Sequence, residues 1–313
     1  RIVIRNIPYN VPQLENLNLP ETVKRIANYE RGLILLTGAT GSGKSSTLAA
    51  IIDYINHTKN RHILTIEDPI EFLIRDRKSI ITQRELGVDA IDFPTALRSA
   101  LRQDPDIIFI GEMRDRSTIE TALTAAETGH LVLSTLHTLD THESINRILS
   151  VFPDAQQKQV RLQLGSVLRA IISQRLAHRT DGKGFIPAVE IMINNARIRE
   201  MIETPERTKE IPTAIEEGKV TFGMQSFDQS LFELVTSELI SYEEALRLTD
   251  NNEDFAIRFG GIDQFEDNER AQWRKNSKYQ KKVANAWDEL SEIEIEGSSS
   301  TPPPPPIKKT RKS

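Results

Sequence analysis

The residues from Gly38 to Ser45 have the types and the spacing of a phosphate-binding loop. They read Gly-Ala-Thr-Gly-Ser-Gly-Lys-Ser, which matches the pattern G-x-x-x-x-G-K-[ST] at every fixed position. Glycines let the backbone turn so that its N–H groups point at phosphate oxygens, and the N-terminus of a following helix favours the same anion. In this pattern Lys44 reaches the β and γ phosphates and Ser45 ligates Mg²⁺.

A strand before the loop and a helix after it must hold the loop in place. Leu33 to Thr37 is a short apolar run, typical of a strand that is buried on both faces, and Ser46 to Ile55 has apolar residues at helical spacing. This context argues against the alternative, a glycine-rich turn that binds nothing. The residues that we expect to contact ATP are Gly38, Thr40, Gly41, Ser42, Gly43, Lys44, Ser45 and Ser46.

Strands and helices alternate over the first half of the chain. Three more apolar runs are interpreted as buried strands: His62 to Glu67, Ile107 to Ile110 and Leu131 to Leu136. This alternation predicts an α/β fold with a parallel sheet and helices on both of its faces. Beyond the last of these strands the pattern is mostly helical. The expected helices there are 140–151, 156–176, 196–203, 227–237 and 241–248, with a strand at 185–193.

Carboxylates follow two of these strands, at the edge where open parallel sheets bind their ligands. Glu112 comes just after Ile110, and we expect it to hold Mg²⁺ through water. Glu71 lies shortly after the strand that ends at Glu67, and we expect it to orient or deprotonate the attacking water. Taken singly, Glu67 and Asp68 are more typical of a helix cap or of surface charge.

Two histidines and several arginines near these strands are open to more than one interpretation. His130 and His137 lie near opposite ends of the strand Leu131 to Leu136, so they are not expected to ligate one metal ion. Spacing alone favours a structural role for both histidines over a phosphate-binding or relay role. The arginines Arg98, Arg102, Arg114 and Arg116 are expected to be solvated, unless one of them stabilises a transferred phosphoryl group.

Composition sets outer bounds on the function. The 313 residues carry a net charge of −5 and include no cysteine, so disulfides and thiolate metal sites are excluded. The charge balance does not suggest binding to nucleic acid. No apolar run approaches the roughly 18 residues that a membrane-spanning helix needs, and no signal peptide opens the chain, so we expect no direct membrane insertion.

The ends of the chain differ from its middle. The opening segment, Arg1 to Ile7, resembles a strand and is followed by prolines, so we expect residues 1–30 to be the remnant of an N-terminal domain with a linker. Residues 31–262 are expected to form the nucleotide-binding domain with a helical C-terminal part. Residues 263–313 have separate basic and acidic stretches and five consecutive prolines, and we expect them to be a disordered tail.

Four motifs together resemble the secretion ATPase superfamily and, within it, the PilT/PilU type IV pilus retraction ATPases. They are GATGSGKS (38–45), ILTIEDPIEF (63–72), DPDIIFIGEMRD (104–115) and TGHLVLSTLHT (128–138). The resemblance covers residues 1 to about 262. It implies a RecA-like P-loop NTPase core with a helical C-terminal subdomain, ATP and Mg²⁺ as cofactors, and a PAS-like N-terminal domain of which only the last strand is present.

The same resemblance assigns roles to single residues. It implies that Glu71 is the catalytic glutamate, that Glu112 is the Walker B glutamate, and that His130 and His137 are the His-box pair. It also implies that Arg5 reaches the nucleotide of the next subunit. These roles come from the motifs and not from the spacing of the residues.

The resemblance further implies a hexameric motor that hydrolyses ATP to retract type IV pili in twitching motility. Its place would be the cytoplasmic face of the inner membrane, on the pilus platform protein, as a homo-hexamer or mixed with a PilT-type paralogue. The segments Arg197 to Ile202 and Ser226 to Arg247 favour the PilU branch. The absence of cysteine argues against pilus-assembly and type II secretion relatives, because these carry a tetracysteine zinc module.

Other functions on the same core are a pilus-assembly or secretion ATPase, a nucleic-acid translocase, and a nucleotide-binding assembly factor that does not turn over. The acidic charge balance weakens the translocase. The presence of both Glu71 and Glu112 weakens the factor without turnover.

Overall fold

The computed structural model describes residue 7 and residues 10–260 of the chain. Arg5, most of the strand-like opening segment and the tail at 263–313 lie outside the described residues. The boundary expected at residue 262 lies outside them as well. What the sequence predicts for these parts therefore stays a prediction.

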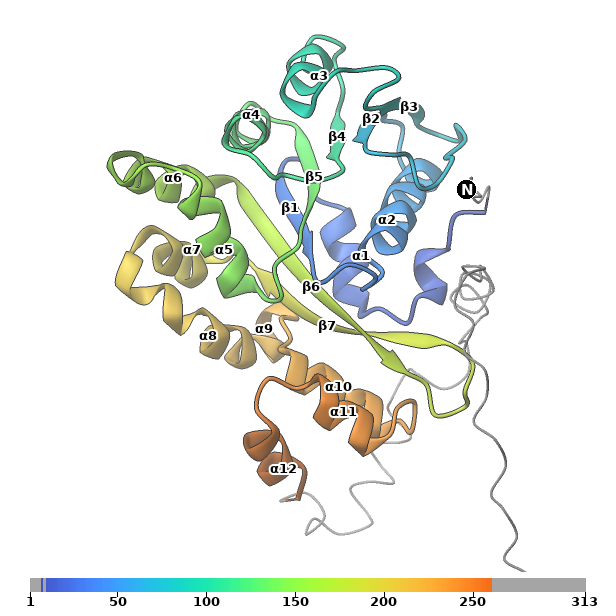
Figure 1. Ribbon diagram of the computed structural model, residues 1–313, viewed down its shortest axis with the longest axis vertical. Coiled ribbons are helices and arrows are strands. Elements are labelled where there is room, and N and C mark those ends of the chain that lie inside the picture. The colour runs from blue at the N-terminus through green and yellow to red at the C-terminus, as the bar shows by residue number, and fades with distance from the viewer. Residues whose placement is uncertain (1–6, 8–9, 261–313) are drawn as a thin grey trace, which may run out of the picture.

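Within the described residues, seven strands form one sheet in the order β3-β2-β4-β5-β1-β6-β7 (Figure 1). The strands are β1 (Gly32–Thr37), β2 (His62–Glu67), β3 (Ile80–Glu85), β4 (Ile107–Ile110), β5 (Leu131–Leu136), β6 (Leu168–His178) and β7 (Phe185–Ile193). Strands β1 to β6 pair in parallel, and β7 pairs antiparallel with β6. The predicted α/β fold with a mostly parallel sheet is confirmed.

Helices cover both faces of this sheet and enclose one hydrophobic cluster on each face. In Figure 1, α1 and α2 lie on one side of the sheet and α4 to α8 on the other. The first layer consists of η1 (Leu14–Asn16), α1 (Glu21–Ala27) and α2 (Lys44–Thr58). The second layer consists of α3 (Phe93–Ala100), α4 (Arg116–Glu127), α5 (Thr141–Ser150), α6 (Asp154–Val167), α7 (Ala196–Glu203), η2 (Pro205–Glu210) and α8 (Ile211–Glu217).

The last helices pack on the long strands β6 and β7. After the short α9 (Lys219–Phe222) come α10 (Phe227–Thr236), α11 (Tyr242–Leu248) and α12 (Asn252–Gly260). A third hydrophobic cluster joins them to Ala177 of β6 and to Ile186 and Ala188 of β7. The helical C-terminal part therefore rests on an extension of the main sheet. None of the described helices combines the length and the hydropathy that crossing a bilayer requires.

One expected helix is partly wrong. The segment 156–176 was expected to be helical throughout, but α6 ends at Val167 and β6 begins at Leu168. β6 pairs with β1 on one side and with β7 on the other, and this pairing overrides the helical pattern of its side chains. The sequence interpretation also missed β3, because this strand lies at the edge of the sheet and most of its side chains are partly exposed.

Candidate functional site

The phosphate-binding loop leaves the carboxyl end of β1 and leads into α2, as its pattern requires. Gly38 and Gly43 have φ angles of 142° and 85°, which glycine adopts without strain. Space is a second constraint at Gly38. A Cβ atom there would lie 2.4 Å from the backbone oxygen of Gln174 and 2.5 Å from Oγ of Ser42. The backbone of β6 therefore packs directly against the first residue of the loop.

Lys44 is the first residue of α2, and its side chain lies within the loop. It is 8% exposed, and its Nζ donates hydrogen bonds to the backbone oxygens of Gly38, at 2.7 Å, and Ala39, at 2.8 Å. Burial lowers the pKa of Lys44, and the negative charges of Glu112 and Glu71 oppose this shift. The two carboxylates thus favour the charged ammonium at the centre of the site.

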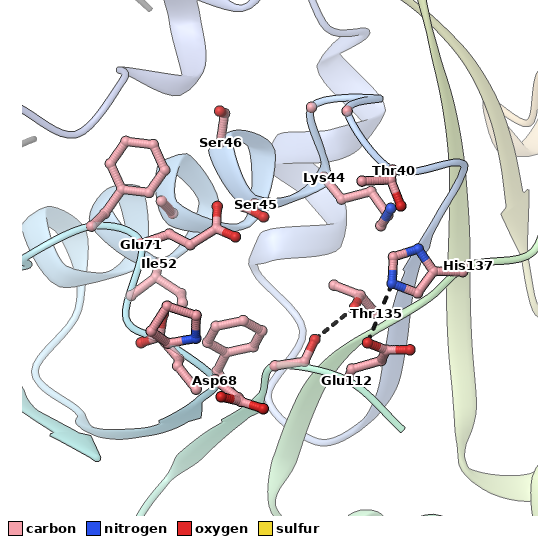
Figure 2. A pocket seen from close by; sticks show the side chains of 18 of the residues that line it. Thr40, Lys44, Ser45, Ser46, Ile52, Asp68, Glu71, Glu112, Thr135 and His137 are labelled. Carbon is pink, nitrogen blue, oxygen red and sulfur yellow. Dashed lines mark hydrogen bonds and ion pairs between the residues drawn. The ribbon is translucent and has the colours of Figure 1, made fainter. Parts of the chain in front are cut away.

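A cavity of about 500 Å³ opens at the carboxyl edge of the sheet, beside the loop. The structure brings Lys44, Ser45, Glu71, Glu112 and His137 to its walls (Figure 2). Of the other residues expected to contact the nucleotide, Thr40, Gly41, Gly43 and Ser46 also line the cavity, whereas Gly38 and Ser42 do not. Residues from four separate motifs therefore share one cavity.

Two basic side chains hold the carboxylate of Glu112. Its Oε2 lies 2.7 Å from a guanidinium nitrogen of Arg114 and 3.2 Å from Nε2 of His137. The side chain of Glu112 is 17% exposed and that of Arg114 is 68% exposed. Next to them, Oγ1 of Thr135 donates a hydrogen bond to the backbone oxygen of Gly111 at 2.6 Å. Of the four arginines considered from the sequence, Arg114 is the one that lines the cavity.

The donors in the cavity fit Mg²⁺ bound together with a nucleotide. Among the described residues, no group of three or more Asp, Glu or His side chains could hold a metal ion by itself. Mg²⁺ commonly takes one or two protein ligands and completes its shell with water and substrate phosphates. The hydroxyl of Ser45 and the carboxylate of Glu112, on the walls of one cavity, are such a pair.

Glu67 and Glu71, near the end of β2, both line the cavity but differ in their surroundings. Glu71 is exposed and lines the cavity from the segment after β2. Glu67, the last residue of β2, is buried, and its Oε1 accepts hydrogen bonds from Thr65, at 2.7 Å, and Gln83, at 3.1 Å. Burial raises the pKa of Glu67. The expectation that Glu67 is a helix cap or a surface charge is therefore wrong.

His130 lies at the opposite end of β5 from His137. Its Nδ1 is 2.9 Å from the backbone oxygen of Ala125, and its own backbone oxygen accepts a hydrogen bond from Gly32. It is not among the residues that line the cavity. The structure thus brings His137 to the site but not His130, and the position of His130 does not support a role in the chemistry of this cavity.

Comparisons with known proteins agree with this geometry. The sequence profile of the family described as "Type II/IV secretion system protein" matches residues 1–245. A twitching motility protein of Neisseria gonorrhoeae is 49% identical over 255 residues, which cover 82% of this chain and 68% of that protein. The chain belongs to the type II/IV secretion system protein family.

Two further proteins are similar in structure or in sequence. A crystal structure of the pilus retraction motor PilT with bound ADP superposes with a TM-score of 0.73 at 46% identity, covering 80% of this chain and 70% of that one. The type IV pilus ATPase PilU of Pseudomonas aeruginosa is 42% identical over 256 residues, which cover 82% of this chain and 66% of that protein. Identity therefore does not decide in favour of the PilU branch.

Some residues that line the cavity belong to none of the four sequence motifs. Phe93 of α3, Leu176 of β6 and Phe185 of β7 all line it. Sequence reasoning missed them because apolar residues do not signal a site, and because Leu176 was assigned to a helix. The antiparallel pair β6 and β7 thus closes one side of the site.

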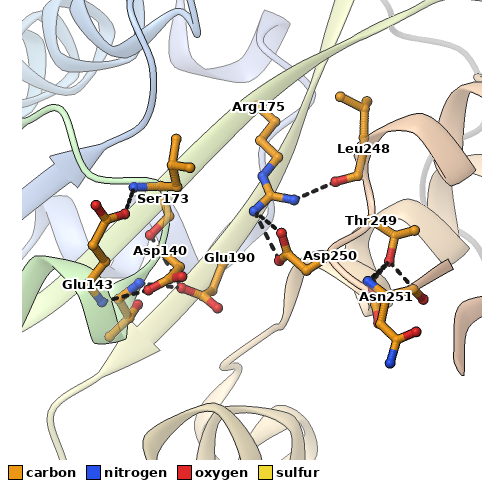
Figure 3. Close-up of polar contacts among 12 residues, drawn as sticks. Asp140, Glu143, Ser173, Arg175, Glu190, Leu248, Thr249, Asp250 and Asn251 are labelled. Carbon is orange, nitrogen blue, oxygen red and sulfur yellow. Dashed lines mark hydrogen bonds and ion pairs between the residues drawn. The ribbon is translucent and has the colours of Figure 1, made fainter. Parts of the chain in front are cut away.

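A buried carboxylate links the strand before the loop to the start of α5. Oε1 of Glu190, on β7, accepts hydrogen bonds from the backbone N–H of Thr141, at 2.8 Å, and from Oγ of Ser173, at 3.3 Å (Figure 3). Oγ of Ser173 accepts in turn from Oγ1 of Thr37 at 3.0 Å. Burial raises the pKa of Glu190. These bonds join the end of β1 to the helix that begins four residues after His137.

Proposed function

We propose that this chain is the ATP-hydrolysing part of a motor that retracts type IV pili in twitching motility. The observation that carries the proposal is one cavity that combines a phosphate-binding loop, the buried Lys44, the carboxylates of Glu71 and Glu112, and a histidine. The similarity to a twitching motility protein and to a pilus retraction motor with bound ADP supports it. The retraction of pili, as distinct from ATP hydrolysis, rests on these relatives.

The loop and Lys44 bind the phosphates of ATP. Backbone N–H groups of the loop and of the first turn of α2 attract the anion, and the ammonium of Lys44 adds a positive charge within the same loop. The side chain of Lys44 turns from the backbone oxygens of Gly38 and Ala39 to the phosphates. Because Lys44 is buried, its charge is screened less than that of a surface lysine.

Ser45 and Glu112 are the residues that would hold Mg²⁺. The ion supplies positive charge that stabilises the phosphates during transfer. Arg114 and His137 both contact Oε2 of Glu112 and thereby orient its carboxylate. In this arrangement the residue that binds the metal ion, Glu112, differs from the residue that activates the attacking water.

Glu71 is the general base for the attacking water. It accepts a proton as the water oxygen forms a bond to the γ phosphorus, while the bond from that phosphorus to the bridging oxygen of ADP breaks. The products are ADP and inorganic phosphate. A general base of this kind contributes about 10²- to 10⁴-fold to the rate. Glu71 is exposed at the mouth of the cavity, where water can reach it.

The motor is an oligomer, a homo-hexamer or a mixed ring with a PilT-type paralogue. Arg5 of one subunit reaches the nucleotide of the next, and the ring works at the cytoplasmic face of the inner membrane against the pilus platform protein. The proposal includes a role for this chain as an accessory motor of the PilU type. The motifs quoted from the sequence support these assignments, and Arg5 itself lies outside the described residues.

Two lysines at the two ends of α2 test the proposed activity. Lys44→Ala removes the buried ammonium from the loop and is expected to abolish MgATP binding or hydrolysis. Lys59→Ala is the matched control, because Lys59 follows the last residue of the same helix and donates to the backbone oxygen of Asn28. Both variants are compared with the wild type in ATPase assays and in cells that lack the gene, where pilus retraction is measured. Unchanged ATP turnover in Lys44→Ala contradicts the proposal.

A further inference from the structure

Gln174 lies in β6, directly behind the phosphate-binding loop, and is fully buried. Its Nε2 donates a hydrogen bond to the backbone oxygen of Ser42 at 2.7 Å. Its Oε1 accepts a hydrogen bond from Oγ1 of Thr47, which is also fully buried, at 2.9 Å. One side-chain amide thus joins the middle of the loop to the first turns of α2.

The backbone of Gln174 contacts the loop as well. Its oxygen is so close to Gly38 that a Cβ atom on Gly38 would lie 2.4 Å away. Gln174 therefore contacts the loop at its first residue through the backbone and at Ser42 through the side chain. Neither Gln174 nor Ser42 lines the cavity, so these contacts lie on the side of the loop away from the nucleotide.

The hydrogen bond to Ser42 restricts the backbone of the loop. A concave anion site needs successive N–H groups that face the anion, and a carbonyl oxygen that turned into the site would repel a phosphate. The amide of Gln174 satisfies the Ser42 oxygen on the buried side. A buried acceptor left without a donor is costly, so this bond disfavours conformations in which the oxygen turns away from Gln174.

Contacts on the opposite face of the sheet hold β6 itself in place. Arg175, whose side chain points the other way, lies 2.7 Å and 3.0 Å from the two carboxylate oxygens of Asp250 (Figure 3). Its guanidinium also donates to the backbone oxygen of Leu248 and lies 3.9 Å above the ring of Phe227. The strand that carries Gln174 is therefore anchored on both faces.

We infer that Gln174 is a positioning residue whose side-chain amide holds the phosphate-binding loop in the conformation that accepts a nucleotide. The inference rests on the proposed function, because it concerns the same loop. If only a fraction of molecules has the loop in its binding conformation, the apparent dissociation constant rises in inverse proportion to that fraction. Loss of the amide donor therefore weakens nucleotide binding although no group that touches the nucleotide changes.

Two isosteric substitutions separate positioning from general stability. Gln174→Glu keeps the size of the side chain but replaces the N–H donor with an acceptor that faces the oxygen of Ser42. Gln225→Glu is the matched control, because Gln225 is 6% exposed and its Nε2 donates to the backbone oxygen of Val189, away from the loop. We expect the dissociation constant for MgADP to rise about tenfold or more in Gln174→Glu. In Gln225→Glu it stays as in the wild type, although both variants lose thermal stability.

Substitutions at Thr47 keep the test decisive if Gln174→Glu does not fold. Thr47→Ser retains the hydroxyl that donates to Gln174 and is expected to bind MgADP as the wild type does, whereas Thr47→Val binds more weakly. Equal binding by the wild type, Gln174→Glu and Thr47→Val overturns the inference, and so does an equal loss in Gln174→Glu and Gln225→Glu. A wild-type protein that does not bind MgADP overturns the proposed function itself.

Discussion

Nε2 of His137 lies 3.2 Å from Oε2 of Glu112, although the two residues belong to different motifs. β4 and β5 pair in parallel, with Ile110 opposite Ser134. Glu112 and His137 each follow the end of one of these neighbouring strands. The pairing of the strands therefore places an imidazole beside a carboxylate in the wall of the cavity, where it can orient the oxygen atoms that would face the metal ion.

The first prediction concerns this contact. His137→Ala removes one of the two groups that hold Glu112, and partners that orient a metal-binding side chain are typically worth about 10- to 100-fold in activity or metal affinity. We expect ATP turnover to fall by that order while the protein still binds MgADP. The control is His142→Ala, because His142 contacts Asn146 on its own helix and does not line the cavity. Equal turnover in the two variants would show that the contact with Glu112 has no catalytic consequence.

The sequence predicted β1, β2, β4 and β5, in which nearly all residues are buried. All residues of β1 and β5 are buried, and such strands appear in a sequence as continuous apolar runs. The phosphate-binding loop was predicted for a different reason, because its chemistry requires particular residue types at short, fixed spacing. The acids were predicted because they follow the ends of two of the expected strands. Both kinds of signal are local.

The parts that sequence reasoning missed depend on contacts between distant segments. Thr37 and Ser173 form a hydrogen bond across 136 positions of the chain, and Thr47 and Gln174 do so across 127. A serine or a glutamine within an apolar stretch does not reveal its partner. For the same reason β6 was taken for a helix, because its identity as a strand depends on β1 and β7 at its sides.

The second prediction separates the two carboxylates. Glu71→Gln removes the proposed general base and should lower turnover about 10²- to 10⁴-fold while leaving MgATP binding intact. Glu112→Gln, the matched change at the proposed metal-binding position, should also shift the Mg²⁺ concentration needed for half-maximal activity or nucleotide binding. Titrations of Mg²⁺ at constant ATP measure both effects. Identical titration curves for the two variants would contradict the division of roles.

The third prediction concerns the buried carboxylate of Glu190. Burial raises the pKa of Glu190 above its ordinary value of 4.5 in spite of hydrogen bonds from Thr141 and Ser173. The folded protein thus favours the protonated form more than the unfolded chain does. The stability that this preference contributes is complete below pH 4.5 and is lost as the pH rises through the raised pKa of the folded protein.

Glu190→Gln keeps an oxygen that can accept the hydrogen bonds of Thr141 and Ser173 but does not titrate. We expect the melting temperature of this variant, relative to the wild type, to increase as the pH is raised from below 4.5 toward neutrality. Glu21→Gln is the control, because it removes a carboxylate from a side chain that is 86% exposed. A difference between Glu190→Gln and the wild type that stays constant with pH would show that burial does not raise the pKa of Glu190.

The fourth prediction compares two glycines of the phosphate-binding loop. Gly38 and Gly41 both have positive φ angles, of 142° and 79°. A Cβ on Gly41 would meet no atom within 4 Å, whereas a Cβ on Gly38 would overlap the backbone oxygen of Gln174. Gly41→Ala therefore carries mainly the conformational cost of a left-handed alanine, about 1–2 kcal/mol. Gly38→Ala also carries a backbone cost, because alanine rarely adopts a φ of 142°, and it must in addition displace β6.

Thermal unfolding and MgADP binding, measured side by side, distinguish the two variants. For a domain of this size, about 1 kcal/mol shifts the melting temperature by roughly 2–4 °C, so Gly41→Ala should lose only a few degrees. Gly38→Ala should lose clearly more, because the atom in its way belongs to the backbone of a strand that is paired on both sides. It should also bind MgADP more weakly, since displacing β6 moves the amide of Gln174 away from Ser42. Equal losses of stability in the two variants would mean that the loop can move away from β6 at little cost, which would contradict the tight packing of Gly38 against Gln174.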